Sequence, residues 1–189
     1  MNPQAWWFVT RAGGLVAYVL LACTVVCGLL LSTHLLGRRP APDWVLDWHR
    51  FVGGLAVVFT VVHLAALLID DYIEFGLPDL LVPGIAPWRP GALAWGVLGL
   101  YLLLAVEVTS LLRNRLPRAL WRRIHYLSLP LLLLATVHTL TAGSDARNPA
   151  VLMLIGGVAA AVVLLLALRI PWATMRDWSV ARTRRVREE

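Results

Sequence analysis

The run W48-H49-R50-F51-V52-G53-G54-L55-A56-V57-V58-F59-T60-V61-V62-H63 is an apolar segment with a histidine near its start and another at its end. A second apolar run repeats the pattern with His125 and His138. The histidines are 14 residues apart in the first run and 13 apart in the second. At about 1.5 Å rise per residue, each pair spans about 20 Å of helix, which fits inside a hydrocarbon core about 30 Å thick. Two antiparallel helices of this kind would offer two imidazole pairs, one near each membrane face.

The composition indicates an integral membrane protein. The chain has 189 residues, of which 59% are hydrophobic and 15% charged, and its mean hydropathy is +0.73. A soluble domain of this length would need more polar surface. The net charge of +6 could suggest a nucleic-acid partner, but every basic residue is an arginine at or beyond the end of an apolar run. Membrane topology explains this distribution better than nucleic-acid binding.

Apolar runs of membrane length occur five times, so we expect an all-α bundle of five transmembrane helices in a single domain, residues 1–189. The first run is too long for a signal-peptide core and has no basic segment before it, which favours a retained helix. Cys23 and Cys27 form neither a zinc motif nor a haem-attachment motif. The expected spans are about 8–36, 49–69, 92–112, 124–140 and 150–170, followed by a basic cytoplasmic tail, 171–189.

The arginines predict the orientation. Of the 17 basic residues, 14 lie in the loops after the first and third spans, at the adjoining span ends and in the tail. The positive-inside rule then predicts a protein of the cell inner membrane with its N-terminus outside and its C-terminus in the cytoplasm. His49 and His125 fall at the cytoplasmic level, and His63 and His138 at the outer level. Because the charge count does not use the histidines, it supports this pairing independently.

Paired histidines inside a membrane point to haem ligation. Intramembrane ionisable groups are costly, and neutral imidazole is a good ligand for haem iron. A hydrogen bond to a neighbouring helix explains a single histidine equally well, but it explains four histidines paired by depth poorly. We therefore expect two b-type haems between the second and fourth spans, with iron bound by His49 and His125 and by His63 and His138.

The two histidine-bearing helices differ in their geometry. At about 100° per residue, 14 residues bring His63 to within about 40° of His49, so both face one side. Thirteen residues leave His138 about 140° from His125 on a straight helix. Pro130 lies between them and removes a backbone hydrogen bond. We predict a kink or widened turn near Leu127–Leu131 that restores the alignment.

Several charged residues are secondary candidates. Arg11 near the outer face, and Arg50 and Arg123 near the inner face, could bind haem propionates, although ordinary topological arginines explain each one alone. Arg122 is a similar candidate. Glu107, inside the third span, is expected to pair with an arginine such as Arg113 rather than to serve a proton or quinone path. We assign His34 a structural or interfacial role.

These residues resemble the ferric reductase-like transmembrane domain. This family includes the membrane parts of NADPH oxidases and ferric reductases, and the haem subunit of the bacterial methionine sulfoxide reductase system. The matching segments are H49-R50-F51-V52-G53 with His63, W121-R122-R123-I124-H125 with His138, and T10-R11-A12-G13-G14. The resemblance implies an inner haem b on His49 and His125 and an outer one on His63 and His138. A histidine at position 49 suits the two-haem members, since the sulfoxide reductase subunit has arginine there.

Two departures from the family bear on the electron donor. Five spans are evident where the family usually has six, and no FAD or nicotinamide domain is recognisable. The resemblance therefore implies a separate donor, either a cytoplasmic flavoprotein carrying FAD or FMN or a membrane quinol. The predicted function is electron transport across the cell membrane to an extracytoplasmic acceptor, as an oxidoreductase subunit that needs partner proteins.

Two alternatives remain open. One is a quinol-linked haem b anchor for a periplasmic oxidoreductase such as methionine sulfoxide reductase. The other is a haem-free scaffold or a transporter whose histidines bind a transition metal. Imidazole pairs about 20 Å apart cannot form one metal site, which argues against the second alternative.

Overall fold

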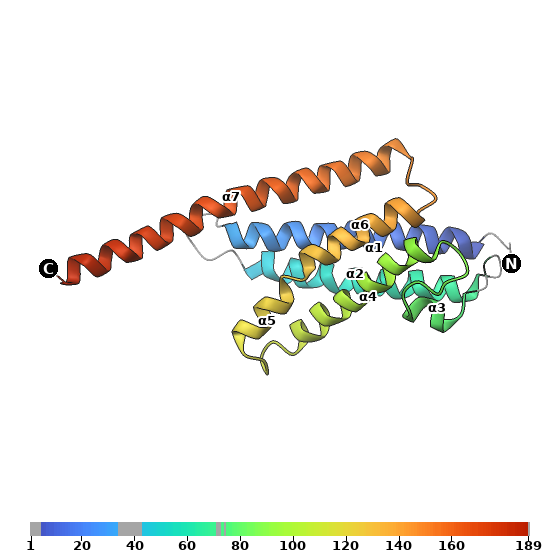
Figure 1. Cartoon of the computed structure of the whole chain (residues 1–189), viewed down its shortest axis with the longest axis horizontal. Coiled ribbons are helices and arrows are strands. Elements are labelled where there is room, and N and C mark those ends of the chain that lie inside the picture. Colours follow the sequence, from blue (N-terminus) through green and yellow to red (C-terminus); the bar gives the residue numbers. More distant parts are fainter. Residues whose placement is uncertain (1–4, 34–42, 71–72, 74, 189) are drawn as a thin grey trace.

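The computed structural model describes residues 5–33, 43–70, 73 and 75–188, and side chains as far as residue 169. All regular secondary structure in these residues is helical (Figure 1). The helices are α1 (Ala5–Thr33), α2 (Asp43–Ile69), α3 (Leu77–Leu81), α4 (Pro90–Leu111), α5 (Arg118–His125), α6 (Ser128–Ala142) and α7 (Pro149–Glu188).

Five stretches are long and apolar enough to cross a membrane, which confirms the predicted number of membrane-length helices. They are α1, α2, α4, the combined α5–α6 stretch and the first part of α7, Pro149–Arg169. Large apolar side chains point away from the bundle: Leu111 is 75% exposed, Met153 72% and Phe51 61%. Such surfaces are costly in water and suited to lipid. The chain is therefore a multi-pass membrane protein.

Two helix pairs form the bundle. α1 packs along α2, α4 packs along α6, and α1 also contacts α6 and α7. The main core lies where α1 meets α6 and α7, and it includes Tyr18, Ala22, Leu132 and Leu165. We call the end of the bundle near Ala5, Ile69 and Ala142 the α3 end, and the opposite end the α5 end (Figure 1). α7 extends beyond the bundle at the α5 end (Figure 1).

The fourth span is interrupted between α5 and α6, where a distortion was expected. Tyr126 and Leu127 separate the two helices. The Leu127 amide donates to the Ile124 carbonyl (2.9 Å) and the Leu129 amide to the Tyr126 carbonyl (3.2 Å). Both bonds reach back three residues rather than four. Pro130 has no N–H, so the Tyr126 carbonyl is free to accept from Leu129. The turn is therefore tightened rather than widened. A residue in a 3₁₀ turn rotates the chain about the helix axis by about 120°, which is about 20° more than in an α-helix.

The segment between α2 and α4 folds over the α3 end. Phe75, Leu80 and Ala86 are buried there against Leu93 of α4. The Tyr101 hydroxyl donates to the Leu81 carbonyl and ties α3 to α4. This packing places α3 beside the cavity described below.

Candidate functional site

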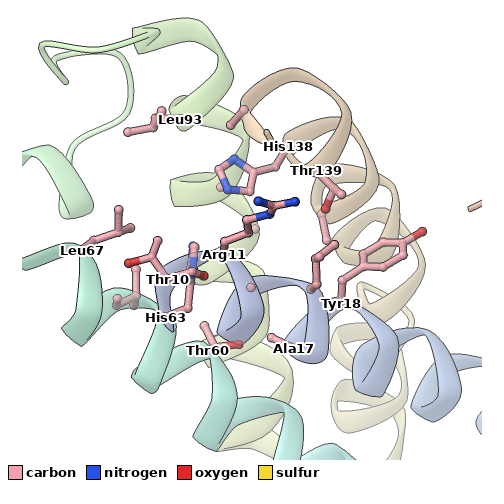
Figure 2. A pocket seen from close by; sticks show the side chains of 18 of the residues that line it. Thr10, Arg11, Ala17, Tyr18, Thr60, His63, Leu67, Leu93, His138 and Thr139 are labelled. Carbon is pink, nitrogen blue, oxygen red and sulfur yellow. The ribbon is translucent and has the colours of Figure 1, made fainter. Parts of the chain in front are cut away.

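The fold brings the four paired histidines together as two imidazole pairs. At the α5 end, the ring centroids of His49 on α2 and His125 on α5 are 6.0 Å apart, with an interplanar angle of 66°. At the α3 end, those of His63 on α2 and His138 on α6 are 6.4 Å apart, with an angle of 75°. Figure 2 shows His63 and His138 on different helices at the cavity of the α3 end. The tightened turn at Tyr126 and Leu127 lies between the two histidines of the fourth span.

These separations fit a metal ion held by one imidazole on each side. An imidazole nitrogen lies about 2.0–2.1 Å from a first-row metal ion and about 1.2 Å from its ring centroid. Two imidazoles on opposite sides of one ion would have centroids about 6.4 Å apart. Among the described residues, no group of three or more His, Cys, Asp and Glu side chains could hold a metal. Each pair therefore offers two imidazoles, the number of ligands that a bis-histidine haem would take from the chain.

Hydrogen bonds to neighbouring helices orient three of the rings. The bonds join the Nδ1 atoms of His63, His49 and His138 to the carbonyl oxygens of Thr10 (2.8 Å), Thr24 (3.0 Å) and Ala92 (3.0 Å). A carbonyl oxygen only accepts, so each Nδ1 carries the proton. The Nε2 atom is then the unprotonated nitrogen with a free lone pair. A metal-ligating histidine has the same arrangement.

A glycine one turn after each of these carbonyls makes room for the ring. A Cβ at Gly14 would lie 3.0 Å from His63 Nδ1, one at Gly28 3.1 Å from His49 Cε1, and one at Gly96 2.8 Å from His138 Cε1. In an α-helix, the side chain four residues after a carbonyl lies on the same face and points back toward it. Only glycine at that position leaves the second lone pair of the carbonyl open to an imidazole.

Sequence reasoning missed this arrangement, although a signal is present. Thr10 and Gly14 recur as Thr24 and Gly28, 14 residues later on α1. This is the spacing of His63 and His49 on the antiparallel helix α2. A threonine followed four residues later by glycine thus occurs twice on α1, at the spacing of the two histidines on α2. We call this pattern, a residue whose carbonyl accepts from an imidazole and a glycine four residues later, the support motif.

A cavity of about 970 Å³ opens beside the His63–His138 pair (Figure 2). Its lining includes Thr10, Gly14, Gly96 and both imidazoles. The volume is at the upper end of the usual range for cofactor pockets, about 300–1,000 Å³. The Thr10 hydroxyl is buried and has no hydrogen-bond partner among the described residues. Its hydrogen is therefore available to a group bound in the cavity.

The three predicted arginines lie at different depths and have different partners. Arg11 lines the cavity, forms a bidentate ion pair with Asp145, and lies over the Trp7 ring at 5.0 Å. Arg50 pairs with Asp47 at 3.2 Å on the exposed face of α2. Arg123 is exposed. Their binding to propionates stays a prediction.

A smaller cavity, about 470 Å³, is lined by Trp121 and by three arginines, of which only Arg122 was among the candidates. Trp121 stacks on the His125 ring with centroids 5.1 Å apart and an interplanar angle of 27°. Its indole N–H is buried and finds no hydrogen-bond partner in the described part of the chain. Trp121 and the three arginines line the same space. The lining residues are Arg113, Asn114, Arg118, Trp121 and Arg122.

Two further expectations concern Glu107 and His34. The expected Glu107–Arg113 ion pair is not formed; the described residues contain two ion pairs, Arg11–Asp145 and Arg50–Asp47. Six residues of helix rotate by about 600°, so Arg113 lies about 120° around the axis from Glu107. The prediction for His34 falls outside the described residues.

Comparison with known proteins gives one match. Residues 13–136 match the family model described as "Ferric reductase like transmembrane component". The matched segment contains His49, His63 and His125 and ends two residues before His138. No curated protein and no solved structure matches the chain. The match covers more than half of the sequence and agrees with the five membrane-length helices, so the chain belongs to the ferric reductase-like transmembrane family.

Proposed function

We propose that this protein carries electrons across a membrane through two bis-histidine b-type haems. The observation that supports this most directly is the pair of ring separations, 6.0 Å for His49–His125 and 6.4 Å for His63–His138. A haem iron ligated on both sides by imidazole exchanges one electron at a time and keeps no open position for a substrate. Membership of the ferric reductase-like family supports the same function.

The chain's own groups would hold the iron ligands in one protonation state. The backbone carbonyls on α1 and α4 accept from Nδ1 and keep Nε2 directed away from those helices. Such outer hydrogen bonds raise ligand basicity and restrict ring rotation. The glycines on α1 and α4 allow the close approach that these bonds require.

Both sites share α2, which would connect the two membrane faces. Four helical turns separate His49 from His63, a rise of about 21 Å along the helix. One site therefore lies toward each end of the bundle. Electrons could pass between them within the protein, without a diffusing carrier.

The α5 end is proposed to face the cytoplasm, which gives the direction of transfer. Its loop carries Arg113, Arg115 and Arg118, all exposed, and the positive-inside rule favours such a loop on the cytoplasmic side. The donor is then a cytoplasmic flavoprotein with FAD or FMN, and the acceptor is on the opposite, extracytoplasmic side of the membrane. A positive loop would attract a donor with an acidic docking face.

Haem content tests the proposal directly. The full-length protein, purified in detergent, is expected to give a b-type reduced-minus-oxidised spectrum and two haems per chain in a pyridine haemochrome count. His49→Ala and His63→Ala should each lose one haem. His34→Ala is the matched control, because His34 is the one histidine outside the two pairs, and it should keep both.

Transfer and orientation need separate measurements. In liposomes that enclose ferricyanide, dithionite added outside should reduce the enclosed oxidant in the wild type and not in His63→Ala. A fluorescent protein fused to the C-terminus should fluoresce if that end is cytoplasmic, whereas an alkaline phosphatase fusion should be inactive. Protein with no haem after expression under ample haem supply would overturn the proposal.

A further inference from the structure

The fourth histidine is held differently from the other three. His125 Nδ1 lies 3.3 Å from the Ser110 hydroxyl oxygen rather than from a backbone carbonyl. Ser110 stands where the glycine of the support motif would stand. Ala92 and Gly96 on α4 support His138, and 14 residues later the same positions are Val106 and Ser110.

The Ser110 hydroxyl acts as a relay between the imidazole and the helix. It donates its single hydrogen to the Val106 carbonyl at 2.7 Å. Toward His125 it can then only accept, so His125 also carries its proton on Nδ1. The Ser110 side chain occupies the space in which an imidazole could reach the Val106 carbonyl. The bond to His125, 3.3 Å, is longer than the 2.8–3.0 Å of the three bonds to carbonyls.

We propose that Ser110 is a positioning residue that weakens the basicity of His125 and so raises the reduction potential of the haem at the α5 end. This inference rests on the proposed function. A strong acceptor at Nδ1 gives an axial imidazole more negative charge, which stabilises ferric iron, and a weaker acceptor does the opposite. The hydrogen-bond acceptors of the two sites would thus differ at one ligand, since the other three histidines are bonded to backbone carbonyls.

Trp121 restricts His125 from another direction. Its indole stacks on the imidazole at 5.1 Å and so limits rotation of the ring. The stacking resists tilting of the ring but allows the imidazole to slide in its own plane toward α4, so substitutions at Ser110 change the acceptor at Nδ1 while the plane of the ring is kept. This makes Ser110 a suitable position for a graded series.

The test is a potentiometric titration of the purified full-length protein, with the ferric low-spin signals followed by electron paramagnetic resonance. Ser110→Gly should lower one of two midpoint potentials, because it opens the Val106 carbonyl to His125. Ser110→Ala should raise the same midpoint, because it removes the acceptor. Ser110→Thr keeps the hydroxyl and should reproduce the wild type. The signal of the other haem should not shift in any variant.

Thr109→Ala is the matched control. Thr109 is the neighbouring hydroxyl on α4, and it bonds to the Ala105 and Val106 carbonyls and not to a histidine. Its removal should leave both midpoints unchanged. Unchanged midpoints in Ser110→Gly and Ser110→Ala, with two haems retained, would overturn the role of Ser110 while leaving the proposed function intact. Loss of one haem from Ser110→Ala, without a shifted midpoint in Ser110→Gly, would also overturn it. A wild type without haem would instead overturn the proposed function.

Discussion

Gly96→Ala should release the haem at the α3 end. A Cβ at Gly96 would lie 2.8 Å from both Nδ1 and Cε1 of His138. Unstrained carbon contacts need about 3.5 Å or more, so the ring must retreat by about 0.7 Å. A direct retreat would stretch the bond between Nδ1 and the Ala92 carbonyl from 3.0 Å to about 3.7 Å, beyond the usual limit of about 3.2 Å.

The expected loss follows from that bond. A buried N–H without a partner costs about 1–3 kcal/mol. Loss of an outer hydrogen bond to a metal ligand typically lowers metal affinity by about 10–100-fold. The gain from replacing a helical glycine by alanine, about 0.5–1 kcal/mol, does not offset this. We therefore expect Gly96→Ala to bind haem at the α3 end about 10–100-fold more weakly and to keep the haem at the α5 end.

The assay is the haem count after dilution into detergent that contains apomyoglobin as a haem acceptor. Gly54→Ala is the matched control, because it makes the same change in helix α2 where no atom lies within 4 Å of the new Cβ. It should keep both haems and gain about 0.5–1 kcal/mol of stability. If Gly96→Ala retains both haems with wild-type kinetics, the close approach of His138 to α4 is not required for binding and the reasoning fails.

Three further perturbations test the packing around the sites. Arg11→Gln should lower the free energy of unfolding by about 1.5–3 kcal/mol, because the Asp145 side chain, 12% exposed, loses its bidentate partner. Additive effects of Arg11→Gln and Asp145→Asn in a double-mutant cycle would contradict this coupling. Tyr18→Phe removes the bond from the buried Tyr18 hydroxyl to Thr136 (3.1 Å) and should cost about 0.5–1.5 kcal/mol in thermal unfolding, with the haem count unchanged. Protein from haem-limited cells should unfold at a lower temperature, and each haem site should contribute about 2.7 kcal/mol of stability at haem concentrations 100-fold above its Kd. An identical melting curve would argue against haem as a resident group.

Much of the fold was predictable because hydropathy is a local property. Five apolar runs predicted five spans, and residues such as Leu111 and Met153, exposed on the bundle surface, need no partner beyond lipid. The depth pairing of the histidines was predictable for a similar reason. Helical rise is constant, so the spacing of His49 and His63 sets their levels before any tertiary contact is known.

The Glu107 prediction failed because proximity in sequence is not proximity around a helix. The distortion of the fourth span was predicted in the right place, since Pro130 lacks an N–H, but its kind was not. Whether a freed carbonyl leads to a widened or a tightened turn depends on which nearby amide can reach it. Here Leu129 reaches the Tyr126 carbonyl.

The sequence alone was therefore sufficient for the membrane class, the number of membrane-length helices and the levels of the four imidazoles. The supports of those imidazoles depended on tertiary packing: the Thr10, Thr24 and Ala92 carbonyls, the Ser110 hydroxyl, and the pairing of Arg11 with Asp145 across 134 positions of the chain. A hydrogen bond between helices requires a particular rotation and depth of both. Hydropathy constrains depth only to within a turn or two. The rotation of each helix is decided by close packing, here by the approach of the imidazole rings to the backbone at Gly14 and Gly96.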